Sequence, residues 1–522
     1  MRIRRPTPGP GRAVGIDLGT TYSAVARVNE FGKPAILPNR DGENITPSVV
    51  FFAGEQPIIG TMAKRSAVTS PLDVVQFVKR SMGDPTWRFE TEAGTAYRPE
   101  EISALILKRL KEDAARTLNA DVTDAVITVP AYFDDGPRRA TIDAGTIAGL
   151  NVLRVLNEPT AAALAYGIDG IDGTASETIL VYDLGGGTFD VTAMWIHADE
   201  FRVLATHGDR NLGGFDFDNA LMRLLDERFV AAGGPSLLDV DEWEAGLRER
   251  AEVAKHTLTT VDRTRVALSA GGFSTVVPVT RAELEDVTSA LLSRTRDIAE
   301  QVVEEAGLTW TSVDRILLAG GATRMPMVRR MLATVSGVKP DGSANPDEIV
   351  ALGAAIQAHL LTTEDDSPSA IRARGTPAMR RPVIHDVTSH GLGKLLYEPG
   401  TDRLVNSVIV PRNTEVPAKG SLVSYTRYEN QDRLRSRITQ GDDKDPATVQ
   451  TIGSETFPIT KYPKGAPFET YLAYDADQTV FVEVKDLTAD KLVGTFEIHN
   501  VANMQEEEIR NAAERIRLVS PD

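Results

Sequence analysis

A short unit occurs twice in this sequence, and it constrains the fold more than any other feature. Ile16–Thr21 reads IDLGTT, and Tyr182–Thr188 reads YDLGGGT. Each copy follows a short run of apolar, β-type residues, so each is expected to be a strand that ends in a glycine turn. A duplicated strand–Asp–Gly–Thr unit predicts two similar subdomains that face one another.

The chemistry of these turns points to phosphate and a cation. Glycine lets the backbone approach a ligand closely, and consecutive backbone N–H groups bind anions. Thr20 adds a hydroxyl donor, whereas Asp17 needs an intervening cation such as Mg²⁺ before it can help to hold phosphate. The second copy repeats this logic, and Asp190 adds a carboxylate. Two such turns would hold a polyphosphate from both sides, and two ordinary glycine-rich β-turns remain the alternative.

A third glycine turn follows another apolar run. Arg315–Ala319 is strand-like and leads into Gly320 and Gly321. This pair would let a flat base or a ribose lie against the backbone, although an ordinary strand–helix turn explains the same residues. The P-loop pattern GxxxxGKS/T is absent from the sequence, and no GxGxxG stands where a Rossmann fingerprint would.

Strand-like and helix-like stretches alternate over residues 13–361, which predicts an α/β architecture. The further strand-like runs are Ala24–Val28, Ala125–Val129 and Thr178–Tyr182. The helix-like stretches are Glu100–Asn119, Ala220–Val230, Trp243–Leu258, Arg281–Ala306 and Asp347–Leu361.

The rest of the chain predicts separate parts, since 522 residues exceed a single core. Residues 1–12 are basic and Pro-rich, and we expect a flexible tail. Residues 362–382 are polar with three prolines, and we expect a linker. Residues 383–502 read as β, with alternation at Val480–Lys485 and Phe496–His499, and predict an antiparallel β-sandwich. A final helix, Met504–Leu518, would be capped by Asn503.

Composition excludes several kinds of function. The net charge of −17 argues against non-specific nucleic-acid binding, because that binding needs basic residues to neutralise phosphates. The chain has no cysteine, which excludes disulfides, thiolate catalysis and cysteine metal sites. No stretch approaches the ~20 apolar residues of a membrane span. We therefore expect a cytoplasmic protein without nucleic-acid or membrane partners.

The three glycine sites, in this order, resemble the actin-like ATPase superfamily, and the chain is most similar to DnaK-type chaperones of the seventy-kilodalton heat-shock family. The stretches that carry this resemblance are GIDLGTTYS (15–23), VITVPAYF (126–133), NEPTAAALAYG (157–167), DLGGGTFDV (183–191), NLGGFDFDNAL (211–221), GGATRMPMV (320–328) and NPDEIVALGAA (345–355). It implies a two-lobed ATPase domain over 13–361, a peptide-binding sandwich over 383–502, and a short lid remnant over 503–522.

The resemblance also implies roles in ATP or ADP binding and in hydrolysis. Asp17, Glu158 and Asp183 would surround Mg²⁺ through water, and Asp190 would neighbour K⁺. The implied catalytic residues are Lys79, Glu158, Asp183 and Thr188. The implied nucleotide-binding residues are Gly19, Thr20, Thr21, Tyr22, Gly185, Gly186, Gly187, Gly213, Gly214, Glu252, Lys255, His256, Thr259, Gly320, Gly321 and Arg324.

Two further sets follow from the same resemblance. A switch that passes nucleotide state between the domains would comprise Pro130, Asp135, Arg138 and Asp386. A cleft for extended polypeptide would include Lys394, Tyr397, Leu434 and Ser436.

Several positions depart from the family pattern. His256 replaces an arginine that stacks on adenine, so weaker or less selective nucleotide binding is expected. His385 replaces an apolar linker residue, which puts coupling between the domains in question. Lys394 and Ser436 are polar where the family is apolar, so the usual apolar client would be disfavoured. Only the first helix of a lid is expected, and a cleft without a lid should release peptide quickly.

The function that this implies is an ATP-dependent chaperone with slow ATP hydrolysis, which binds unfolded segments and works with a J-domain co-chaperone and a nucleotide exchange factor. A non-chaperone actin-like ATPase that acts as a regulatory scaffold is the first alternative. A small-molecule kinase of the same superfamily is the second. ATP turnover stimulated by unfolded polypeptide would separate the chaperone from the scaffold.

Overall fold

The computed structural model describes residues 13–54, 56–170, 176–363, 382–398, 400–475, 480–498 and 503–519. The expected flexible tail (1–12) and most of the expected linker (364–381) lie outside these ranges. Within them, no helix is both long and apolar enough to cross a membrane.

The first lobe is built on a mixed sheet with the strand order β11-β10-β1-β2-β3, and β4 pairs with β2. The central strands β1 and β10 are parallel and buried, as their apolar sequences predict. Helices α2 and α3 pack on one face of this sheet, and α10 packs on the other. The bounds are β1 Ala13–Asp17, β2 Tyr22–Val28, β3 Pro34–Ile36, β4 Thr46–Pro47, β10 Asp124–Val129, β11 Asn151–Asn157, α2 Pro99–Leu118, α3 Asp135–Ile147 and α10 Ile349–Thr362.

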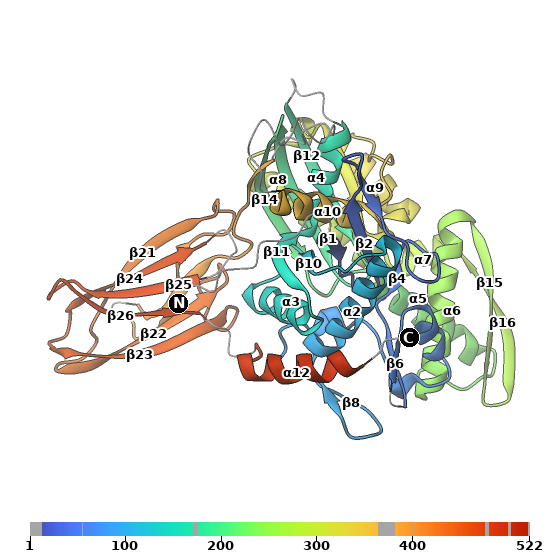
Figure 1. The fold of residues 1–522 in the computed structure, drawn as a ribbon, viewed down its shortest axis with the longest axis horizontal. Helices are drawn as coiled ribbons and strands as arrows, with labels where there is room; N and C mark the ends of the chain where they lie inside the picture. Colours follow the sequence, from blue (N-terminus) through green and yellow to red (C-terminus); the bar gives the residue numbers. More distant parts are fainter. Residues whose placement is uncertain are drawn as a thin grey trace.

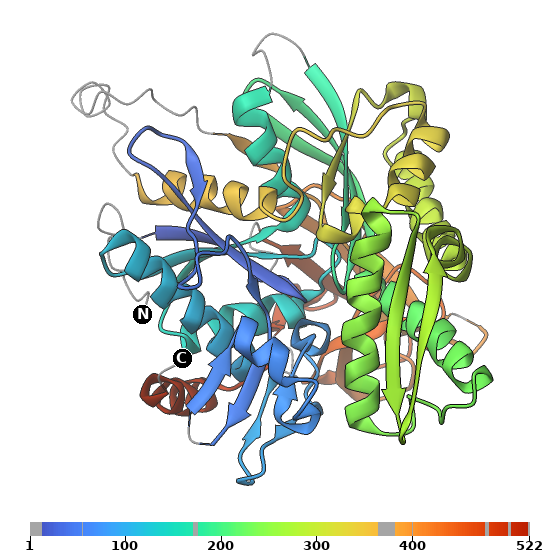
Figure 2. The same ribbon diagram turned by 90° about the vertical axis from the view of Figure 1, so that its right-hand side faces the viewer.

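The second lobe repeats this plan with the strand order β17-β12-β13-β14-β18. Helices α8 and α9 cover one face, while α4 and α10 lie between the two lobes (Figure 2). This duplicated arrangement matches the expected α/β class. The bounds are β12 Ser176–Leu184, β13 Phe189–His197, β14 Glu200–Asp209, β17 Arg315–Ala319, β18 Val383–His385, α4 Glu158–Gly170, α8 Ser289–Glu305 and α9 Pro326–Ser336.

A smaller unit extends each lobe. In the first lobe it comprises β5 Val50–Ala53, β6 Gln56–Ile59, β7 Val74–Val75, β8 Phe89–Glu90, β9 Ala96–Tyr97, α1 Thr61–Ser66, and the 3-10 turns η1 Pro71–Asp73 and η2 Val78–Ser81. In the second lobe, an apolar core joins a hairpin to three helices. These elements are β15 Arg263–Ala270, β16 Phe273–Thr280, α5 Gly214–Ala231, α6 Asp241–Thr260 and α7 Arg281–Val287, followed by η3 Trp310–Ser312 and η4 Gly321–Arg324.

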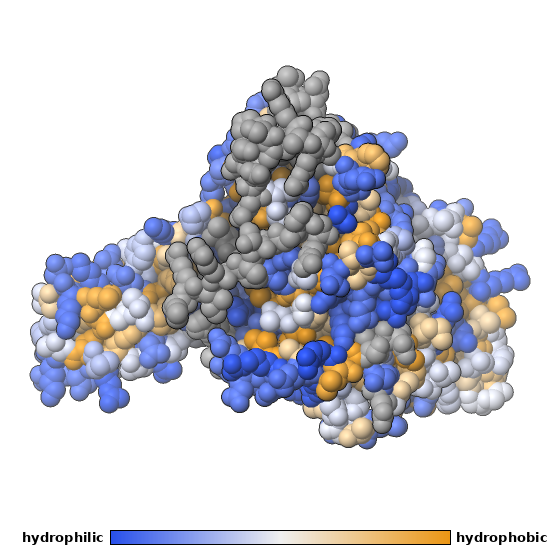
Figure 3. Space-filling view, in the orientation of Figure 1, coloured by the Kyte–Doolittle hydropathy of each residue, from blue (hydrophilic) through white to orange (hydrophobic). Residues whose placement is uncertain are grey.

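The β-rich part is a sandwich of two antiparallel sheets, with the orders β20-β19-β22-β23 and β21-β24-β25-β26. It projects to one side of the lobes (Figures 1 and 3). The bounds are β19 Leu392–Tyr397, β20 Leu404–Val410, β21 Ala418–Tyr425, β22 Gln431–Gln440, β23 Gln450–Tyr462, β24 Pro467–Tyr474, β25 Val480–Asp486 and β26 Lys491–Glu497.

Three boundaries differ from the sequence-based expectation. Val383–His385 forms β18, which pairs with β14 of the second lobe, so these residues do not belong to the sandwich. The single helix expected over 281–306 is two helices, because the chain turns at Thr288 with φ −108° and ψ 5°. The last helix, α12 Glu506–Leu518, begins after Gln505 instead of Asn503.

Helix α12 lies against α2 and α3 of the first lobe (Figure 1). Ala512 and Ile516 are buried in the core that contains α2 and α3. Arg98 pairs with Glu508 at 3.2 Å, and Lys108 bonds to the carbonyl of Ile516 at 2.9 Å, near the end of the helix, where a cation is favourable. The helix that was expected as a lid remnant is therefore docked on the first lobe.

Candidate functional site

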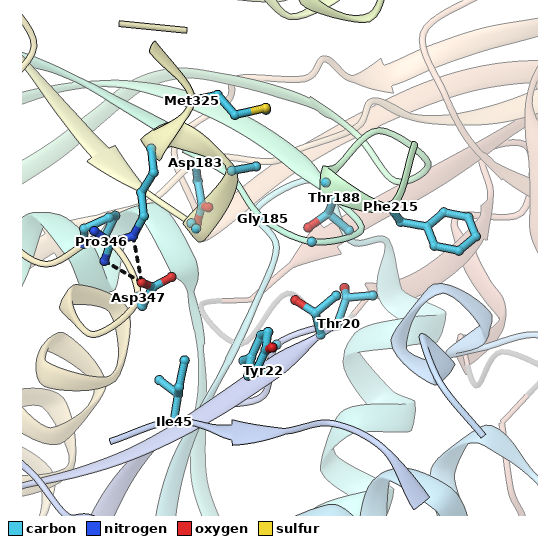
Figure 4. A pocket seen from close by; sticks show the side chains of 18 of the residues that line it. Thr20, Tyr22, Ile45, Asp183, Gly185, Thr188, Phe215, Met325, Pro346 and Asp347 are labelled. Atoms are coloured by element: carbon cyan, nitrogen blue, oxygen red, sulfur yellow. Dashed lines mark hydrogen bonds and ion pairs between the residues drawn. The ribbon is translucent and has the colours of Figure 1, made fainter. Parts of the chain in front are cut away.

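A cavity of about 460 Å³ lies between the two lobes. The strand-end turns after β1 and β12 form two of its walls, and the turn after β17 forms a third. The structure thus brings all three glycine sites of the sequence to one place. Figure 4 shows the Thr20 and Thr188 side chains, one from each lobe, close to one another.

The two Asp–Gly–Thr turns touch one another. A Cβ atom on Gly187 would lie 2.4 Å from Cγ2 of Thr20, and one on Gly186 would lie 2.3 Å from Oγ1 of Thr21. Side chains at these glycines would force the turns apart, so glycine is needed for close approach. Backbone N–H groups and threonine hydroxyls from both lobes therefore face the same small space.

Next to these turns, the carboxylates of Asp17, Glu158, Asp183 and Asp190 form an acidic cluster around one lysine. Lys79 donates from Nζ to Oε1 of Glu158 at 2.6 Å, and both residues are buried. Burial, with the nearby Glu158 carboxylate, raises the pKa of Asp17 to about 7 and that of Asp190 to about 7. The same two causes raise the pKa of Asp183 well above its ordinary value. Since one lysine does not balance these carboxylates, the site favours a bound cation.

The short turn η2 carries Lys79 into this cluster. Phe77 before it has a positive φ of 60°, and its ring packs against Phe215 with centroids 4.5 Å apart. Arg80 bonds to the carbonyl of Gly187 at 3.0 Å and to Oδ2 of Asp216 at 2.5 Å. The sequence analysis missed Arg80, which ties the lysine-bearing segment of the first lobe to the Asp–Gly–Thr turn of the second.

The opposite end of the cavity is suited to a base and a ribose. Gly320 has a φ of 78°, and a Cβ there would lie 2.4 Å from the carbonyl oxygen of Leu184. Arg324 donates to Oδ2 of Asp347 from Nε at 3.0 Å and from Nη2 at 2.5 Å, the contacts dashed in Figure 4. This pair holds the guanidinium at the cavity wall.

Helix α6 supplies the remaining wall. Glu252 bonds to Lys64 of the first lobe at 2.7 Å, and Lys64 also donates to the Tyr22 hydroxyl at 2.7 Å. Lys255 pairs with Asp218 at 2.8 Å. The Lys64–Glu252 contact bridges the lobes across the cavity, whereas Lys255 and Asp218 join α6 to α5 within the second lobe.

Most of the residues expected to bind nucleotide line this one cavity. They are Asp17, Gly19, Thr20, Thr21, Tyr22, Lys79, Glu158, Asp183, Gly185, Gly186, Thr188, Gly214, Glu252, Lys255, His256, Thr259, Gly320, Gly321 and Arg324. Three expected residues, Gly187, Gly213 and Asp190, are not among the lining residues. Lining residues to which sequence reasoning gave no role are Ile45, Phe215, Asp218, Thr260, Ala322, Met325, Pro346, Asp347 and Val350.

The expected switch residues lie between the cavity and the sandwich. Nε of Arg138 donates to the carbonyl of Phe133 at 3.0 Å, and Nη2 donates to Oδ1 of Asn157 at 2.5 Å. Asn157 in turn donates to Oδ2 of Asp386 at 2.7 Å. Pro130 directly follows β10, and Asp135 is the first residue of α3. Asn157 was in a stretch that carried the resemblance, but its bridging position needed the structure.

A second connection runs through Tyr132, which sequence reasoning did not single out. Its backbone N–H donates to Oδ1 of Asp190 at 2.9 Å. Its ring contacts His390 at a centroid distance of 4.3 Å, and Nε2 of His390 lies 3.1 Å from the Tyr132 carbonyl. Ser389 also bonds to the carbonyl of Ala131 at 2.5 Å. These contacts join the acidic cluster to the start of the sandwich.

The expected peptide cleft differs from the structure. Lys394, Leu434 and Ser436 are buried between the two sheets, with exposed fractions of 1%, 7% and 0%. Their inward direction follows from strand alternation, because each stands on the face of its strand that the opposite sheet covers. Tyr397 alone is exposed. In this structure, therefore, three of the four residues do not line an open cleft.

The comparisons with known proteins agree with this geometry. The sequence matches the model of the Hsp70 protein family over residues 13–518. It is also 39% identical to the chaperone protein DnaK of two strains of Thermus thermophilus, over 539 aligned positions that cover 97% of this chain and 83% of each relative. The family resemblance seen in the sequence is confirmed.

Proposed function

Because this chain belongs to the Hsp70 family, it is an ATP-dependent chaperone, and we propose that it binds and hydrolyses ATP in the cavity between its two lobes. The observation that carries this proposal is the meeting of the two Asp–Gly–Thr turns above Lys79 and its surrounding carboxylates. Neither the scaffold nor the small-molecule kinase is favoured by the family match.

Each part of the cavity has a role in this proposal. Backbone N–H groups of the two turns, with the hydroxyls of Thr20 and Thr188, would bind the phosphates. Lys79 would stabilise negative charge on the transferred phosphoryl group as water attacks phosphorus and the bond to ADP breaks. Glu158 holds the lysine in place at 2.6 Å. Hydrolysis of this kind depends on positioning and charge, and slow turnover is expected.

The carboxylates fit a magnesium ion. Asp17, Glu158 and Asp183 are hard oxygen donors. Burial raises the pKa of Asp17 and of Asp183, and a divalent cation would favour their charged forms. In the described parts of the chain, no three His, Asp or Glu side chains are grouped closely enough to ligate a metal directly. Mg²⁺ commonly keeps several waters, so these residues would hold it through water. It would neutralise phosphate charge, and K⁺ would lie near Asp190.

We further propose that nucleotide state reaches the sandwich through Tyr132 and Arg138. Tyr132 contacts Asp190 on one side and His390 on the other, and Arg138 reaches Asp386 through Asn157. A change at the phosphates that moves Asp190 would alter both contacts of Tyr132. Strand β18 pairs with β14 of the second lobe, and this pairing supports coupling between the lobes and the sandwich. His385 of β18, which stands where the family has an apolar residue, bonds to Glu415 at 2.8 Å.

The partners in this proposal are unfolded polypeptides, a J-domain co-chaperone and a nucleotide exchange factor. A cytoplasmic location is part of it, supported by the absence of cysteine from the whole sequence.

Single-turnover ATP hydrolysis by the full chain, with and without an unfolded protein, tests the proposal. We expect hydrolysis that requires Mg²⁺ and is accelerated by the unfolded protein. A hydrolysis rate that unfolded protein does not change would refute coupling between the domains. Failure to bind magnesium-ATP would refute the proposed ATP site.

A further inference from the structure

The interior of the sandwich contains a lysine without a counter-charge. Lys394 of β19 is 1% exposed, and its side chain crosses from one sheet to the other. Nζ donates to Oγ1 of Thr470 at 2.7 Å and to Oγ of Ser424 at 3.3 Å. Both acceptors are neutral hydroxyls, and no carboxylate among the described residues pairs with this lysine. A buried ammonium without a carboxylate is costly to the fold.

A fourth polar group lies on the neighbouring strand. Ser436 of β22 is fully buried, and no described residue bonds to its hydroxyl. It stands two residues from Ile438, the register partner of Lys394, on the same inward face. We call Lys394, Ser424, Ser436 and Thr470 the polar cluster.

The polar cluster divides an otherwise apolar interior. One apolar group, which includes Leu392 and Leu472, lies on its lobe side. Another, which includes Leu434 and Phe468, lies on its distal side. An incompletely bonded polar network is worse for stability than an apolar core. Its presence between two well-packed groups therefore indicates that it serves something other than the fold.

Exposed side-chain contacts join the two distal loops that follow β19 and β21. Arg427, after β21, lies 3.7 Å from the ring centroid of Tyr397 and bonds to Asp402 at 2.6 Å. Exposed contacts of these two kinds contribute little to stability, because solvent screens them. The loops after β19 and β21, the strands that carry Lys394 and Ser424, can thus separate from one another at small cost.

The outer face of β22 has the matching charge. Arg433, Arg435 and Arg437 alternate with the inward-facing residues of that strand, and none forms an ion pair with a described residue. This basic stripe stands out in a chain whose net charge is −17. Such a stripe attracts acidic segments to the sandwich.

We propose that the polar cluster is a specificity pocket for an aspartate or glutamate side chain of an extended client polypeptide, an assignment that rests on the chaperone function proposed above. The carboxylate supplies the missing counter-charge to Lys394 and accepts a hydrogen bond from Ser436. Ser424 and Thr470 keep the ammonium in place. The sandwich then prefers acidic segments over the aliphatic ones that an apolar pocket would hold.

Fluorescence anisotropy with the full chain tests this pocket. The probes are labelled peptides of serine and asparagine that differ only at one central position, which is Asp, Asn or Leu. Native protein should bind the Asp peptide at least ~10-fold more tightly than the Asn or Leu peptide. Lys394→Met, which keeps the volume and removes the charge, should abolish the Asp-over-Asn preference. Lys419→Met, at an exposed lysine of β21, should leave it unchanged.

Equal binding of the Asp and Leu peptides, or an Asp preference that survives in Lys394→Met, overturns the proposal. Absence of binding for all three peptides overturns it as well. A parallel assay with an unfolded protein distinguishes failure of the pocket from failure of the chaperone function. If unfolded protein stimulates ATP hydrolysis but the Asp peptide is not preferred, the chaperone function is supported and only the pocket is refuted.

Discussion

Replacing Lys394 with methionine should stabilise the sandwich at neutral pH, by an amount that follows from its burial. Burial lowers the pKa of Lys394 from 10.5 to about 8. Between these values the unfolded chain holds more protons than the folded one, so the stability of the native protein rises with pH across this window. Below a pH of about 8 the charged lysine is buried in full, and this lowers the stability of the folded protein. The pKa difference between the unfolded and the folded chain corresponds to about 3 kcal/mol of lost stability.

The variant removes this penalty but also loses the two hydrogen bonds to Thr470 and Ser424, each worth about 1 kcal/mol. The lost bonds and the changed packing do not depend on pH, whereas the charge penalty shrinks to about 1 kcal/mol at pH 9.5. The gain from Lys394→Met should therefore be about 2 kcal/mol smaller at pH 9.5 than at pH 7.

Hydrogen exchange read by mass spectrometry measures this difference in the full chain. Peptides from β19, β22 and β24 report the opening free energy of the sandwich, and comparison of the two proteins at one pH cancels the intrinsic exchange rates. The protection ratio of variant to native protein should fall about 30-fold from pH 7 to pH 9.5. Lys419→Met should show a ratio near one throughout. An equal ratio for Lys394→Met at both pH values would refute an uncompensated buried ammonium.

Four further substitutions test other parts of the structure. Lys79→Ala should keep ATP binding but slow single-turnover hydrolysis at least ~100-fold, and an unchanged rate would remove Lys79 from the mechanism. Thr188→Ala should slow the same reaction about 10-fold with a modest loss of affinity; an unaffected rate would argue against phosphate contact there. Gly187→Ala would place a methyl group 2.4 Å from Thr20, so calorimetry should detect at least ~10-fold weaker magnesium-ATP binding, and native affinity would mean that the turns need not touch. Ile516→Ala should weaken docking of α12 by about 2–5 kcal/mol, seen as faster exchange in that helix alone; unchanged exchange would contradict its burial.

Much of the site chemistry was visible in the sequence because it depends on residues that are close together in the chain. The turns at Asp17 and Asp183 combine a carboxylate, glycines and threonine within a few positions, and that local combination already indicates phosphate and a cation. The burial of β1 and β10 was equally predictable, since runs of apolar residues indicate central parallel strands.

Other properties arise only when distant segments meet. Lys79 is an ordinary lysine in the sequence until folding places it against Glu158, 79 residues away. The resemblance placed Lys394 near a cleft, but the facing sheet decided that its side chain is buried. The cap and the end charges predicted a final helix, and the apolar surface of α2 and α3 decided where that helix packs. A sequence pattern reports what each segment must bury or pair, and only the tertiary structure determines which segment satisfies it.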